Sequence, residues 1–143
     1  MKRLLYISLF IVSFPTTMLA QNAFDVCVNG QVSPGYSVIN QIASAKVIPG
    51  VVGKITYICS FNIVNAVAQS IAIVEGTGTV CGTGTVGMSG GITPATGWVL
   101  GATAVIVVNP PYWVNKTATA GDDICILQSG TGQVSGGIRW VQQ

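Results

Sequence analysis

The chain has 143 residues, of which 50% are hydrophobic and 7% are charged, and it contains no histidine. It is too apolar for a disordered chain, and its length suits one domain around one core. Acid–base catalysis and metal binding draw mainly on His, Asp, Glu and Lys. Six basic residues, four acidic residues and no histidine therefore argue against an enzyme and against a metal or cofactor site.

The first twenty residues have the layout of a secretory signal peptide. Basic residues at positions 2 and 3 precede an apolar run from Leu4 to Val12, and the small residue Ala20 closes the segment. The run is too short for a membrane span, which takes about 20 apolar residues. We therefore predict a signal-peptide helix at residues 1–20 that is removed after Ala20. The alternatives are that the segment stays as an N-terminal core helix or as an anchor.

Residues 21–143 are then expected to form one exported domain without a membrane span. Loss of the two leading basic residues leaves four basic and four acidic side chains, and hence no formal net charge. A neutral domain offers no basic patch to phosphates, which argues against nucleic-acid binding, and neutrality favours association. We expect an extracellular, periplasmic or surface-displayed protein, with a virion as one such surface.

The pattern after residue 20 predicts many short strands. Runs of Val, Ile, Thr and aromatic residues alternate with Gly, Pro and Asn, and no long helical periodicity is present. In chain order, the expected strands cover residues 24–28, 36–39, 46–48, 54–63, 70–75, 98–100, 103–108, 116–120, 124–128 and 133–141. The last two are expected to form a hairpin around residues 129–132. The Gly- and Thr-rich stretch 76–91 is expected to be a glycine-rich strand pair or an ordered loop.

The strand at 54–63 has the clearest alternation. A two-residue period places five side chains on one face: Ile55, Tyr57, Cys59, Phe61 and Ile63. Short strands with a turn about every ten residues are typical of a sandwich. We therefore predict an all-β fold: a single antiparallel β-sandwich, jelly-roll-like, preceded by the signal-peptide helix.

The cysteines predict two disulfides. All four lie after the signal segment, and an even number in an exported chain favours a disulfide framework. They are Cys27, Cys59, Cys81 and Cys125. Their wide spacing and the lack of histidine argue against zinc. Three pairings are possible, and the expected strand order favours Cys59 with Cys81 and Cys27 with Cys125.

The acidic residues do not predict a catalytic or metal site. Asp122 and Asp123 are adjacent, so in a strand their side chains would point to opposite faces, and a turn after Gly121 is the simpler interpretation. Glu75 is expected to be a surface residue at a strand end. Serine and threonine are common, but no histidine is present to activate them.

Aromatic residues offer one candidate binding site. Tyr112 and Trp113 follow two prolines, which predicts a loop, and together they could stack on a sugar. The alternative is that they fill the core or an interface, as aromatic residues in small sandwiches often do.

Four segments resemble a group of mostly uncharacterised small β-proteins of phages and bacteria, known from environmental sequences. They are YICSFN (57–62), VEGTGTVC (74–81), KTATAGDDICIL (116–127) and SGGIRWV (135–141). In that group they look like parts of virion-surface or fibre-associated sandwich domains. The resemblance implies a structural role without catalytic residues. The signal segment departs from the group, since virion parts are usually assembled in the cytoplasm, and it also admits a secreted bacterial protein.

Two functions follow as hypotheses. The first is a non-catalytic structural or assembly module, displayed on a virion or cell surface, that self-associates or binds other surface or virion proteins. The alternative is a secreted carbohydrate-binding or adhesion module whose partners are glycans.

Overall fold

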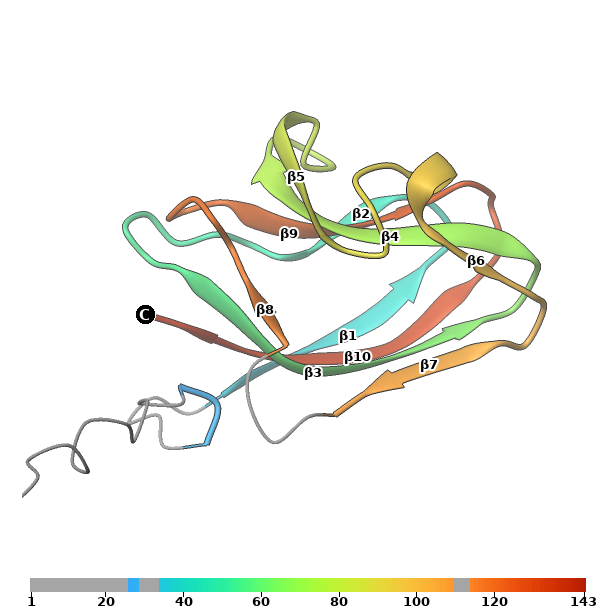
Figure 1. The fold of residues 1–143 in the computed structure, drawn as a ribbon, viewed down its shortest axis with the longest axis horizontal. Helices are drawn as coiled ribbons and strands as arrows, with labels where there is room; N and C mark the ends of the chain where they lie inside the picture. The colour runs from blue at the N-terminus through green and yellow to red at the C-terminus, as the bar shows by residue number, and fades with distance from the viewer. Residues whose placement is uncertain (1–25, 29–33, 110–113) are drawn as a thin grey trace, which may run out of the picture.

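A computed structural model describes residues 26–28, 34–109 and 114–143. Its strands form two antiparallel sheets that pack face to face (Figure 1). The predicted signal peptide at 1–20 lies outside the described residues. The segment expected as the first strand, 24–28, is described only at residues 26–28, which form a turn instead of a strand.

Sheet A is the lower layer in Figure 1 and has the order β1-β10-β3-β7, with β8 also paired to β3. Its strands are β1 (Gly35–Gln41), β3 (Thr56–Asn65), β7 (Val105–Val108), β8 (Asn115–Lys116) and β10 (Val134–Gln142).

Sheet B is the upper layer and has the order β2-β9-β4-β5, with β6 also paired to β4. Its strands are β2 (Ala45–Ile48), β4 (Gln69–Thr77), β5 (Thr83–Ser89), β6 (Trp98–Leu100) and β9 (Asp123–Gln128). One turn of 3₁₀ helix, η1 (Pro94–Thr96), precedes β6.

The strand pairing is that of a jelly roll, as predicted. The first strand pairs with the last (β1 with β10), the second with the second-last (β2 with β9), β3 with β7 and β8, and β4 with β5 and β6. The chain is thus one long antiparallel hairpin rolled into two sheets. Strands β9 and β10 lie in different sheets, so the hairpin expected around residues 129–132 is wrong. That segment instead crosses from one layer to the other.

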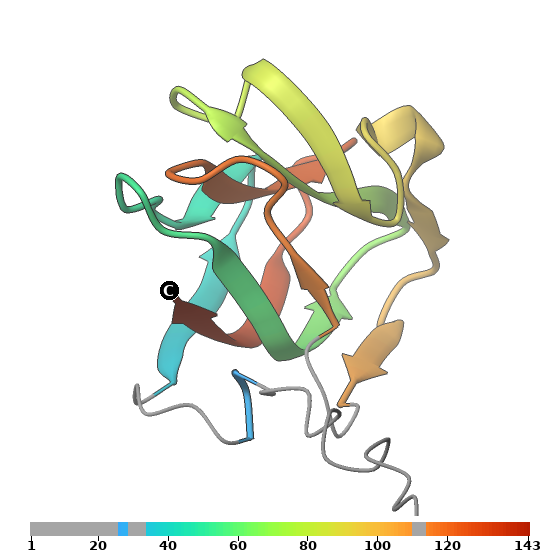
Figure 2. The same ribbon diagram turned by 60° about the vertical axis from the view of Figure 1, so that its left-hand side comes forward.

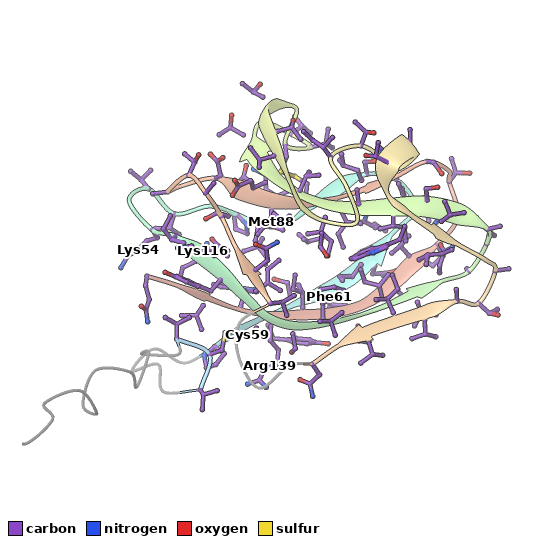
Figure 3. All side chains as sticks on the ribbon, in the orientation of Figure 1. Lys54, Cys59, Phe61, Met88, Lys116 and Arg139 are labelled. Carbon is purple, nitrogen blue, oxygen red and sulfur yellow. A yellow bond between two sulfur atoms is a disulfide. The ribbon has the colours of Figure 1, made fainter. Side chains whose placement is uncertain are left out.

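Isoleucine dominates the core between the sheets. Nine of its side chains are almost fully inaccessible: Ile39, Ile48, Ile58, Ile63, Ile71, Ile73, Ile124, Ile126 and Ile138. β-branched residues pack well on a pleated surface, and the two-residue period directs them inward from both layers. Figure 3 shows Phe61 and Met88 reaching into the same space from opposite sheets.

A bulge in β3 changes the face on which its residues lie. Arg139 pairs with Ser60 and Trp140 with Ile58, so Cys59 is an extra residue without a partner in the register. Phe61 therefore faces the core, as expected, whereas Cys59 and Tyr57 face outward. The predicted common face for these side chains is wrong, because a two-residue period does not continue through a bulge.

Candidate interaction surface

The disulfides differ from the predicted pairing. Cys27 is joined to Cys59 and Cys81 to Cys125, so the expected Cys59–Cys81 and Cys27–Cys125 bonds are wrong. The bulge turns Cys59 to the outside of sheet A, where residues 26–28 lie, while Cys81 and Cys125 meet outside sheet B. Two disulfides are compatible with an exported protein.

The Cys81 loop, residues 78–82, covers part of the outer face of sheet B. Cys125 projects outward from β9 and lies beside Val74 in the register. The disulfide packs with Val74 and Ala72, and all of these side chains are fully buried. Cys81 has a φ of 55°, a left-handed conformation that is uncommon for a residue with a side chain. The turned backbone brings its sulfur back onto the sheet.

The outer face of sheet A is covered at one end. There Val26, Cys59 and Val141 form a small buried cluster with Cys27 and Tyr57 packed against it. Figure 2 shows the 26–28 segment, in blue, below the sheet.

On the rest of this face, exposed apolar side chains lie among exposed polar ones such as Asn40 and Asn62. The register aligns Val38, Gly137, Asn62 and Val107 in one row across β1, β10, β3 and β7. The exposed large side chains of this face are Tyr36 (63%), Val38 (69%), Val64 (37%), Val105 (57%) and Val107 (67%). We call these five residues the open face.

Tyr36 lies across the sheet at one side of the open face. A Cβ atom on Gly137 would come within 2.0 Å of the Tyr36 hydroxyl, so the absence of a side chain at Gly137 makes room for the ring. Arg139 is opposite Tyr36 in the register and exposed, and Figure 3 shows it projecting from the outside of the lower layer. An aromatic ring, a guanidinium and the exposed amide of Asn62 thus share one side of this surface.

Glu75 is not the surface residue that the sequence predicts. It is 1% exposed and lies near the C-terminal end of β4. Its two carboxylate oxygens accept the Ala118 N–H at 2.9 and 2.7 Å, and the Thr119 N–H also donates to it. Burial raises the pKa of Glu75 above its ordinary value, and the nearby Asp122 adds to this rise. The carboxylate fastens the β8–β9 connection to sheet B.

The two adjacent aspartates have different surroundings. Asp123 pairs with Lys46 at 2.6 Å and accepts the Gly50 N–H at 2.8 Å, which ties the ends of β2 and β9 together. Asp122 is buried near Glu75. Among the described residues, no three His, Cys, Asp or Glu side chains are grouped so as to hold a metal ion.

The expected sugar site, Tyr112 and Trp113, lies outside the described residues, so it remains a prediction.

Within the described part of the chain, no helix has the length and hydropathy to cross a membrane.

Comparison with known proteins finds no relative: no family model, no curated protein and no solved structure matches the chain. The resemblance to phage and bacterial β-proteins therefore stays a prediction, and function is inferred from this chain's own geometry.

Proposed function

We propose that the protein is a structural assembly module of a cell or virion surface, and that the open face binds other protein subunits. One observation carries the proposal: the open face leaves five large side chains exposed on sheet A, whereas on sheet B the Cys81–Cys125 disulfide and the outer side chains packed with it are buried. Contiguous exposed apolar surface usually marks an interaction site. The signal-like N-terminal segment and the two disulfides support a location outside the cytoplasm.

The charge distribution supports the same proposal. The register aligns a set of outward-facing residues on β1, β10, β3 and β7, and within this set Arg139 alone is charged. Charged residues are depleted at the centres of protein interfaces. A valine-rich face with few charges fits a protein partner better than it fits a charged ligand.

Sedimentation velocity across a concentration series tests the proposal. The disulfide-bonded protein should associate, and replacing Val38 and Val107 together by lysine should weaken the association. The matched control is Val99→Lys, since Val99 is 84% exposed on β6 of the other sheet. A parent protein that stays monomeric at every concentration and captures no other surface protein would contradict the proposal.

A second function, carbohydrate binding in adhesion, is favoured by the position of Tyr36. Its ring lies beside Arg139 and Asn62, which supply hydrogen-bond donors and an acceptor to sugar hydroxyls, while the ring offers an apolar surface. A glycan array with the parent protein and Tyr36→Ala tests this function. It is rejected if no glycan binds, or if binding is unchanged in the variant.

A further inference from the structure

Among the described residues, β7 forms one edge of sheet A. Within the described residues it pairs with β3 alone, and Figure 1 shows it at the margin of the lower layer. Its sequence is Val-Ile-Val-Val. The strand therefore lacks charged residues and proline, with which natural edge strands commonly prevent pairing to another chain.

The hydrogen-bond register shows which backbone groups of β7 face outward. The Asn65 N–H donates to the Ala104 carbonyl at 3.0 Å, so Ala104 directs its backbone groups toward β3. The direction of the backbone N–H and C=O groups alternates along a strand, so those of Ile106 also point toward β3. Val105 and Val107 lie between these positions and direct their N–H and C=O groups away from it. Each copy of the chain thus presents two donors and two acceptors along this edge.

We infer that a second copy of the chain binds this edge, β7 against β7, antiparallel about a twofold axis through Ile106. In this register Val105 of each copy lies opposite Val107 of the other, and four hydrogen bonds satisfy all the outward groups of both strands. Opposite residues share a face, so the exposed valines of the two copies form one continuous patch. A shift by one residue would set inner side chains against outer ones.

The edge strands β2, β5 and β1 are less suited to this pairing. β2 carries Lys46, and β5 has register shifts along its pairing with β4; both features discourage edge contacts. β1 contains Gly35 and Asn40, which have low strand propensity. The charge on Arg139 lies two strands from β7, so the twofold brings no like charges together.

The inference rests on the proposed function and names its partner and register. An edge of four residues buries less than the roughly 1,000 Å² expected of a stable interface. The contact should therefore be a weak dimer, or one element of a larger assembly, and it should depend on protein concentration.

Val107→Lys and Val38→Lys form a matched pair that tests the inference. Both valines lie in the same row of the open face with nearly equal exposure, 67% and 69%, but on opposite edges of the sheet. Sedimentation equilibrium should show that Val107→Lys weakens dimerisation roughly tenfold or more, because a charge then enters the paired edge, while Val38→Lys, at the opposite edge of the sheet, weakens it by a much smaller factor. Unfolding midpoints equal to that of the parent would show that both variants fold.

Amide hydrogen exchange of the parent protein tests the register directly. The Val105 and Val107 amides should become protected as concentration rises, whereas the Ile106 amide, which faces β3, should be protected at all concentrations. Association with both valine amides unprotected, or with Val38→Lys at least as disruptive as Val107→Lys, would overturn the edge pairing and leave the assembly function standing. A strictly monomeric parent that binds no other surface protein would overturn both.

Discussion

The outer faces of the two sheets are built from similar residues but have different exposure. On sheet B, Ala72 and Val74 are fully buried beneath the Cys81 loop, whereas on sheet A, Val38 and Val107 stay mostly exposed. Strand sequence alone does not decide this difference, since both faces carry β-branched side chains. It is decided by the loop that a disulfide attaches to one sheet and by the short segment that covers only one end of the other.

The largest expected effect comes from removing the Cys81–Cys125 disulfide by replacing both residues with alanine. The bond joins residues 44 positions apart, for which loop closure contributes about 4 kcal/mol to stability. Both cysteines are fully buried, so their truncation also leaves a cavity. Denaturant unfolding gives the loss in free energy of unfolding for this variant and for the variant with alanine at Cys27 and Cys59, and the two losses compare the outer faces of the two sheets.

The Cys27–Cys59 bond spans 32 positions, so its loop-closure contribution is nearly the same. Cys27 is half-buried, and less packing should be lost there. A cost for this pair equal to or above that of the Cys81 pair would show that burial beneath the Cys81 loop adds no stability.

Glu75→Ala is expected to cost about 2 kcal/mol, because the Ala118 N–H loses a charged acceptor. Glu75 lies near the end of β4, shortly before the Cys81 loop, so the variant tests whether the position of that loop depends on the β8–β9 connection. Thermal unfolding at several pH values, with Glu75→Gln as the control that keeps the shape of the side chain, measures it.

The pH dependence of the same residue has a definite sign. Its pKa is raised above 4.5 in the folded protein, so the folded state binds the proton more tightly than the unfolded state. The resulting stability is fully present below pH 4.5 and is lost as the pH rises through the folded pKa. Glu75→Gln should flatten this decline, and an unchanged pH profile in that variant would contradict the assignment.

Val74→Ala and Val107→Ala compare the covered and the open face by the same substitution. Val74 is fully buried, so its truncation should cost about 2 kcal/mol, close to the lower values for core truncation. Val107 is mostly exposed and should change stability by less than about 0.5 kcal/mol. Similar costs in denaturant unfolding would mean that the two faces do not differ energetically.

Gly137→Ala should have the smallest effect, below about 1 kcal/mol, because the new methyl group meets the end of the Tyr36 side chain, which can move aside. Gly97→Ala is the control on the side of sheet B. Its Cβ would lie 2.4 Å from the Ile71 carbonyl oxygen, and backbone cannot yield in the same way. Crystal structures of both variants, with their unfolding midpoints, would show whether Tyr36 alone moves.

The sequence predicts the fold well because short runs of β-branched and apolar residues and the spacing of the turns between them are local signals. Strands such as Asp123–Gln128 and Trp98–Leu100 follow from them almost residue by residue. The sequence does not predict properties that depend on pairing between distant strands. The bulge at Cys59 arises from the register between β3 and β10, and it turns Cys59 to the side where Cys27 lies.

Local sequence patterns also do not predict that the open face is exposed. Val38 and Val74 are both valines in apolar strands, yet one is exposed and the other is buried. Their difference arises from which loop packs on each sheet. The predicted surface position of Glu75 is wrong for a related reason. Its carboxylate accepts a hydrogen bond from Ala118, 43 positions away, and no pattern within β4 indicates this contact.

The position of β10 has a consequence for biogenesis. This strand, Val134–Gln142, is the last in sequence order, and it lies between β1 and β3 in the middle of sheet A. Until β10 has been synthesised, neither neighbour has its main pairing partner, and such long-range pairing is slow. The two central pairings of sheet A should therefore form only after β10 has emerged from the ribosome.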